Sequence, residues 1–149
     1  MKKINVKNTY KLKIAGGPKE HIIKMLDSED YGVAPSRILY IKPKVVVNVG
    51  DRVKVGSQLF FDKKNEINVF LSPVSGVVKD IVYGEKRIVQ AIIITADKKY
   101  EKEKICDPLS INQIKEADVA DIKSIIQRGG LWSSFSEYPF NRAPDKDEV

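Results

Sequence analysis

Hydrophobic and polar positions alternate over short runs in residues 47–89, which predicts strands joined by tight turns. Four glycines punctuate these runs, and we expect each to adopt a positive φ angle: Gly50, Gly56, Gly76 and Gly84. The polar residues 62–68 would form the turn between two arms of a hairpin module. Short strands that pass between two small sheets predict a compact β sandwich or barrel.

Further strands are expected on both sides of this module, at residues 10–14, 37–47 and 87–96. Pro43 would confine the second of these to a sheet edge or split it, because proline cannot donate a ladder hydrogen bond. The third reads RIVQAIIITA and is expected to be the most buried strand. Residues 21–26 fit a short strand or a helical turn, and residues 27–32 and 97–103 are interpreted as loops.

The spacing of apolar residues changes in the last third of the chain, from the alternation of strands to the spacing of a helix. Val119, Ile122, Ile125 and Ile126 fall on one face of a helix that Asp118 would cap and Gly129 would end. Residues 110–116 predict a further helical turn, and residues 131–135 another short helix. The fold class is therefore mainly β with a short α segment.

Composition narrows the possible classes of protein. The chain has 149 residues, 42% hydrophobic and 31% charged, as expected of a globular protein, and it contains no apolar run of the ~20 residues that span a bilayer. Its first residues are basic but lack the apolar segment of a secretory signal. The single cysteine, Cys106, and the single histidine, His21, exclude an internal disulfide and the usual zinc ligand sets. We expect no metal site and no catalytic centre in this chain.

Charge is unevenly distributed along the chain. Residues 1–64 hold 14 Lys and Arg against 6 Asp and Glu, whereas residues 65–149 hold 12 against 14, so the net charges are +8 and −2. A basic half can be an ordinary solvated surface, or it can face nucleic acid, anionic lipid or an acidic protein. No aromatic RNA-binding platform accompanies the charge, so we favour the ordinary solvated surface and expect no nucleic-acid partner. Among the functional interpretations, we prefer salt-sensitive docking to a membrane-bound partner.

The hairpin module resembles the biotinyl- and lipoyl-carrier fold, the barrel-sandwich hybrid. Carrier domains place a modified lysine at the hairpin tip, eight residues before the proline of an A/S-P-x-x-G turn. Counting back from Pro73 reaches Asn65, and the neighbouring Lys63 and Lys64 lie too early and lack carrier-type flanking residues. We therefore expect the carrier fold without a covalently attached cofactor.

An ordered set of motifs resembles the A subunit of the sodium-translocating NADH:quinone oxidoreductase family. Residues 12–18 read LKIAGGP, residues 29–36 read EDYGVAPS, residues 72–78 read SPVSGVV, and residues 130–133 and 139–144 read GLWS and PFNRAP. The resemblance covers nearly the whole chain. Two segments depart from it: the hairpin tip reads KNEI where the family has K-N-P-G, and SEY precedes Pro139 in place of a more basic run.

The resemblance implies a peripheral subunit on the cytoplasmic side of the bacterial inner membrane, in a complex that couples electron transfer from NADH to ubiquinone to sodium export. Its partners would be the other subunits, which would hold the flavins and the iron–sulfur centre, so that this chain itself binds no cofactor. Because family members are longer, residues 105–149 would be a helical segment and tail leading to a missing downstream domain. Residues 1–36 would be an N-terminal strand and connector, and residues 37–104 the barrel-sandwich hybrid.

The resemblance also implies that two segments lie near quinone, and it makes six residues candidates for the site: Tyr31, Gly32, Val33, Phe140, Asn141 and Arg142. Tyr31 and Phe140 could offer ring faces, and Arg142 or Asn141 a donor to a quinone carbonyl. The alternative for the aromatic residues near the carboxyl end is a small satellite core of Trp132, Phe135, Tyr138 and Phe140. Alternatives for the whole chain are the C subunit of an Rnf-type electron-transport complex, a carrier domain or a basic nucleic-acid binder.

Overall fold

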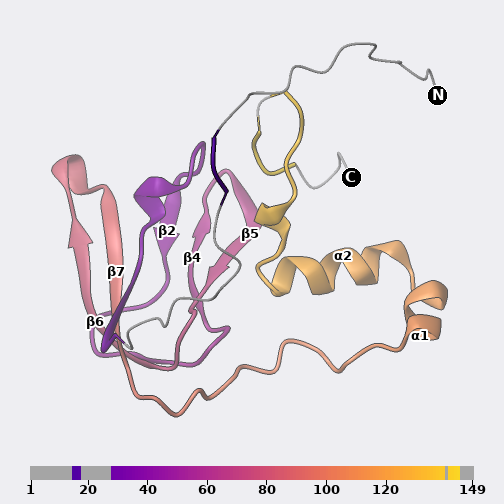
Figure 1. Ribbon diagram of the computed structural model, residues 1–149, viewed down its shortest axis with the longest axis horizontal. Helices are drawn as coiled ribbons and strands as arrows, with labels where there is room; N and C mark the ends of the chain where they lie inside the picture. The colour runs from indigo at the N-terminus through magenta and orange to yellow at the C-terminus, as the bar shows by residue number, and fades with distance from the viewer. Residues whose placement is uncertain (1–14, 18–27, 140, 145–149) are drawn as a thin grey trace.

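Two curled antiparallel sheets form the body of the protein in a computed structural model that describes residues 15–17, 28–139 and 141–144 (Figure 1). One sheet has the strand order β1-β7-β6-β3 and the other β2-β4-β5. The strands are β1 (Asp30–Val33), β2 (Pro43–Val45), β3 (Arg52–Val53), β4 (Gln58–Asp62), β5 (Asn65–Leu71), β6 (Gly76–Tyr83) and β7 (Val89–Ala96). The predicted class, mainly β with a short α segment, is confirmed.

The core lies between the two sheets and is built from their inward-facing side chains. Ile92 and Ile94 of β7 have no exposed surface, because the period-2 alternation of the strand turns both inward. Leu59 and Phe60 of β4 also have no exposed surface; they are adjacent, and the pairing of β4 with β5 shifts register between Gln58 and Phe60. Phe60 stacks on Phe70 of β5 with ring centroids 4.6 Å apart. β7 is thus a core strand, but β4 buries three of its five residues and β7 three of eight, so the expectation that residues 87–96 are the most buried strand is wrong.

Two of the four punctuating glycines adopt the predicted backbone conformation. Gly50 and Gly56 have φ angles of 93° and 96°. Gly84 has a φ of −93°, and Gly76 is not among the glycines with positive φ, so the prediction is wrong for both. At Gly76 the reason for glycine is close approach of two strands, since a Cβ atom there would lie 2.0 Å from the carbonyl oxygen of Thr95.

Three predicted segment boundaries are wrong. Residues 30–32, expected to be part of a loop, belong to β1, which pairs antiparallel with β7 from Asp30 opposite Thr95 to Val33 opposite Ile92. Within residues 37–47 only β2 is a strand. The 3₁₀ helix η1 (Pro35–Arg37) ends at the start of this range, and the strand begins only at Pro43. The polar turn expected over residues 62–68 is reduced to residues 63–64, since β5 begins at Asn65.

The pairing of β4 with β5 is irregular at its hairpin end. Phe61 lies opposite Val69 and Asp62 opposite Asn65, so one step along β4 is matched by four along β5. The buried Asp62 carboxylate holds the turn, because its Oδ1 accepts hydrogen bonds from the backbone N–H groups of Lys42 and Lys64 at 2.8 and 3.0 Å. An irregularity of this kind turns side chains away from the directions that a regular ladder would impose.

The helical segment follows a long connection that leaves β7 and crosses below the sheets in Figure 1. Ser110 and Gln113 form a capping box at the start of α1 (Ile111–Glu116), and α2 spans Val119–Arg128, which confirms both helical predictions. Asp118 and Gly129 take the two cap positions of α2, but the Asp118 side chain makes no capping hydrogen bond. The 3₁₀ helix η3 (Trp132–Ser134) confirms the third. α2 and η3 both contact β5, so this segment covers the edge strand of the smaller sheet.

The strand predicted at residues 10–14 and the segment at residues 21–26 lie outside the described residues. The predicted division of the chain into three parts, with boundaries after residues 36 and 104, stays a prediction. β1 lies before the first boundary, yet it is a strand of the larger sheet.

Candidate functional site

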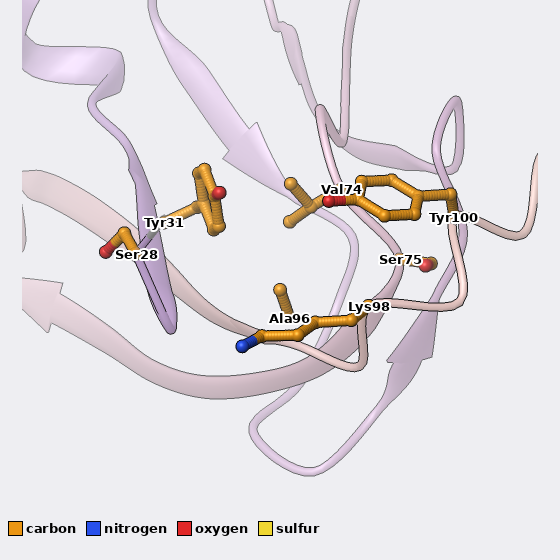
Figure 2. A pocket seen from close by; sticks show the side chains of 7 residues that line it. All are labelled: Ser28, Tyr31, Val74, Ser75, Ala96, Lys98 and Tyr100. Carbon is orange, nitrogen blue, oxygen red and sulfur yellow. The ribbon is translucent and has the colours of Figure 1, made fainter. Parts of the chain in front are cut away.

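The structure has a small hollow beside Tyr31. It lies where β1, the turn before β6 and the end of β7 meet. In Figure 2 the rings of Tyr31 and Tyr100 lie on opposite sides of it, with Val74 and Ala96 between them. Its free volume is about 20 Å³. That is room for one or two water molecules, so this hollow, called the Tyr31 hollow below, is too small for an aromatic ligand.

A hydrogen-bonded carboxylate holds the loop that closes the Tyr31 hollow. The Ser75 hydroxyl donates to Asp97 Oδ1 at 2.7 Å, and the backbone N–H of Lys99 donates to the same oxygen at 3.0 Å. These two bonds, and then the charges of Lys99 and Arg52, hold the pKa of the Asp97 carboxyl below its usual range. On the neighbouring strands, hydrogen bonds from Lys79 and Thr95 likewise lower the pKa of Asp30.

A larger recess lies around the β4–β5 hairpin. It consists of two adjoining hollows of about 320 and 310 Å³. We call it the Asn68 groove and define it by the residues that line both hollows: Leu39, Ile41, Asn68, Arg142 and Ala143. Volumes of this size are at the lower end of those that bind small organic molecules in proteins.

The walls of the Asn68 groove combine apolar surface with positive charge. Ile38, Ile41 and Phe70 supply half-buried apolar side chains, and Leu39 lies 71% exposed at the mouth. The cations are Arg37, Lys64 and Arg142. Asp62 adds one buried carboxylate, which accepts two backbone hydrogen bonds, so three cations and one anion of the described lining surround an apolar floor.

The carbonyl group of Pro144 joins the C-terminal wall of the groove to both η3 and β5. The Pro144 oxygen accepts hydrogen bonds from Trp132 Nε1 at 2.9 Å and from Asn65 Nδ2 at 3.3 Å. Arg142 and Glu137 form an ion pair across the preceding turn. Trp132 is 1% exposed and lies beside the ring of Phe135, with 5.8 Å between centroids, so the predicted satellite core is centred on Trp132. Tyr138, which we also expected in it, is 97% exposed.

The six residues expected near quinone do not share one recess. Tyr31 lines the Tyr31 hollow, whereas Asn141 and Arg142 line the Asn68 groove. Gly32 is exposed, and Val33 packs against the core. Phe140 lies outside the described residues. Whether any of the six binds quinone stays a prediction.

Sequence reasoning missed Asn68 and the apolar residues 38–41. Asn68 is one polar residue in the run INVFL, and since both faces of that run are apolar, its alternation does not reveal which face Asn68 occupies. The groove is assembled from three separate segments, so no local spacing marks it.

Within the described ranges, no helix is both long and apolar enough to cross a membrane. No three His, Cys, Asp or Glu side chains of the same residues gather closely enough to hold a metal ion. Cys106 is exposed and carries a free thiol.

Comparison with known proteins identifies the family. Residues 4–97 match the family model described as the NqrA N-terminal barrel-sandwich hybrid domain, which confirms the predicted fold. The A subunit of the Na(+)-translocating NADH-quinone reductase from Pseudomonas aeruginosa strain UCBPP-PA14 is 31% identical over 144 residues, 97% of this chain and 32% of that protein. The corresponding protein from Cellvibrio japonicus is 37% identical over 109 residues, 70% of this chain and 23% of that protein.

The Glaesserella parasuis protein of the same name is 30% identical over 146 residues, 98% of this chain and 32% of that protein. The chain therefore spans about a third of the length of these curated relatives. The predicted resemblance is confirmed, and the chain belongs to the NqrA N-terminal barrel-sandwich hybrid domain family.

Proposed function

We propose that this chain acts within the NqrA component of a sodium-pumping NADH:quinone reductase, where it helps assemble the complex and admits a quinone head group to the Asn68 groove. The complex would pass electrons from NADH to ubiquinone and export sodium. The family assignment supports the first statement, because the matching relatives carry the name of that component. It also favours NqrA over the related Rnf protein.

The observation that carries the quinone proposal is the shape and lining of the Asn68 groove. A quinone head group needs an apolar slot, flat surfaces against its ring and a donor to its carbonyl oxygens. Ile41 and Phe70 offer the apolar surface, and the Arg142 guanidinium offers donors. Two hollows of about 310–320 Å³ can take the ring and the start of its tail, whereas the Tyr31 hollow of about 20 Å³ cannot.

The redox chemistry would belong to the other subunits. This chain has a single cysteine, whereas [2Fe–2S] and [4Fe–4S] clusters are held by about four thiolates. The iron–sulfur centre would therefore bind elsewhere in the complex, and the family resemblance implies the same for NADH and the flavins. This chain would be a peripheral part on the cytoplasmic side of the membrane, and its own contribution would be to place the quinone head group.

Titration with a short-chain ubiquinone tests the quinone proposal directly. With the amides of the 149-residue chain assigned, we expect saturable chemical-shift changes at Leu39, Ile41 and Ala143 and none at Tyr31. Arg142→Gln should weaken binding about three- to tenfold, because a charge-assisted donor is lost. Lys104→Gln is the matched control, since this exposed cation pairs with Asp107 and lies outside the groove lining. Absence of saturable shifts, or shifts centred on Tyr31, would refute quinone access through this groove.

Assembly is tested by co-purification of the remaining subunits from membranes. The exposed lysines beside the groove, Lys42, Lys44 and Lys63, are candidates to dock on an acidic surface of another protein of the complex. Replacing all three by Gln should reduce recovery of the complex and make it more sensitive to salt. The control replaces Lys98, Lys99 and Lys102 on the connection that follows β7. Equal loss in both variants would show that total charge, and not this surface, determines assembly.

A further inference from the structure

Asn68 is exceptional among the buried polar side chains of the described residues. There are four such side chains: Asp62, Asn68, Ser72 and Ser75. Asp62 accepts two backbone hydrogen bonds, Ser72 donates to the Val74 carbonyl, and Ser75 donates to Asp97. Asn68 is 3% exposed, yet its Oδ1 accepts no hydrogen bond from any residue that the structure describes. A buried acceptor left in this state lowers the stability of the fold.

The strand irregularity explains why this side chain lies at the groove. Asn68 falls in the part of β5 where four residues match one step of β4, so its direction is not set by a regular ladder. It lines both hollows of the groove, together with Arg142 and Ile41. A polar side chain with an unused hydrogen-bonding atom thus lies where the two hollows meet.

The chemistry of a carboxamide suits an oxygen-bearing ring. A half-turn about χ2 exchanges Oδ1 and Nδ2 with little change of shape, so the same side chain can offer donors or an acceptor to a ligand. Nδ2 can donate to a quinone carbonyl, and Oδ1 can accept from the hydroxyl of the reduced ring. The apolar residues around it would contact the ring faces.

We propose that the Asn68 carboxamide is the polar contact that orients a planar, oxygen-substituted ring in the groove, with Arg142 as a second contact. This inference rests on the proposed function and identifies a binding residue for it. Nδ2 donates to a carbonyl of the oxidised ring, and the unused Oδ1 finds a donor when the hydroxyl of the reduced ring is bound, so Asn68 favours binding at some cost to the stability of the free protein.

The test replaces Asn68 by Leu, which has nearly the same shape and no hydrogen-bonding atom. Short-chain ubiquinone should bind Asn68→Leu about tenfold more weakly, while the melting temperature stays equal to or rises above that of the unaltered chain. Asn68→Ala, which cannot overpack the site, should show a similar loss of binding. Asn112→Leu carries the same chemical change on the exposed face of α1 and should bind like the unaltered chain.

The outcomes separate this contact from the quinone proposal itself. If the unaltered chain shows no saturable binding, the proposed function fails and the contact fails with it. If the unaltered chain binds and both Asn68 variants bind equally well, only the Asn68 contact is refuted. If both variants bind weakly but also melt several degrees lower, Asn68 has a structural role, and the proposal is likewise overturned.

Discussion

The Tyr31 hollow and the Asn68 groove lie on the same small protein but differ in how they are enclosed. The Tyr31 hollow is bounded by paired strands and by the hydrogen-bonded Asp97 loop, and only about 20 Å³ remains. The Asn68 groove is bounded by a 3₁₀ helix, an irregular hairpin and a C-terminal turn, and its two hollows measure about 310–320 Å³. Regular pairing closes space, whereas irregular segments leave it open.

The difference has a physical origin in the kind of structure that forms each wall. β1 pairs with β7 without a register shift, and β6 pairs with β7 along most of its length with two register shifts, so the walls of the Tyr31 hollow belong to one hydrogen-bonded sheet that packs closely. The groove wall at residues 141–144 is held by side-chain bonds to the Pro144 carbonyl, by the ion pair of Arg142 with Glu137, and by backbone hydrogen bonds that join Glu137 to residues 141 and 142. A turn held in this way can adjust to a ligand more readily than a sheet.

The largest expected loss of stability comes from placing a side chain at Gly76, where β6 and β7 approach closely. Gly76→Val should destabilise the protein by about 3 kcal/mol or more, because a side chain cannot fit 2.0 Å from the Thr95 carbonyl oxygen. Gly32→Val is the matched control on β1 of the same sheet, where nothing lies within 4 Å, and it should change stability by less than about 1 kcal/mol. Urea denaturation measures both, and equal midpoints would contradict the close-approach argument.

The next largest loss of stability should affect the C-terminal wall of the Asn68 groove more than the sheets. Trp132→Phe removes the Nε1 donor to the Pro144 carbonyl and part of a fully buried ring, so we expect a loss of about 2 kcal/mol. Amide hydrogen exchange should quicken on β5 more than on β7, and quinone binding should weaken. Phe135→Leu, at a 46% exposed ring, is the control and should leave both nearly unchanged. Uniformly faster exchange would mean that the two regions unfold together.

A smaller loss of stability is expected from a change at α1, because no residue of α1 lines the Tyr31 hollow or the Asn68 groove. Ser110→Ala removes one half of the capping box and should destabilise α1 by about 1 kcal/mol. Backbone chemical shifts of Ile111–Glu116 would move towards coil values, while quinone affinity stays the same. Asn112→Ala, inside the helix, serves as the control. A loss of quinone binding in Ser110→Ala would show that the helical segment also shapes the groove.

The smallest effect should be the pH dependence that Asp97 gives to the Tyr31 hollow. Hydrogen bonds from Ser75 and Lys99 lower the Asp97 pKa in the folded state below the ordinary value of 3.8. The carboxylate therefore adds stability above the unfolded pKa, and this contribution is lost as the pH falls through the folded pKa. Asp97→Asn should show a shallower fall in stability below pH about 4 than Asp107→Asn, which removes the same charge at an exposed pair. Parallel acid curves would refute this role.

Local features of the chain were predictable where the physics is local. The helix at Val119–Arg128 follows from its apolar spacing and its bounding residues, and the capping box at Ser110 forms within one turn. The positive φ angles at Gly50 and Gly56 were predictable, because glycine adopts this conformation more readily than other residues. Prediction was wrong where the cause is distant: Asp30 became a strand residue because β7 lies beside it, and Gly76 is needed because of Thr95.

The sequence by itself determined the class of fold, the helical segment and, through an ordered set of motifs, the family. The tertiary structure alone decided that Tyr31 and Arg142 line different recesses, and that Asn68 lies buried with an unused acceptor between two hollows. The reason is that alternation, capping and turn preferences act over a few residues. A groove is the space left between segments that are distant in the sequence, and its size depends on how closely they pack.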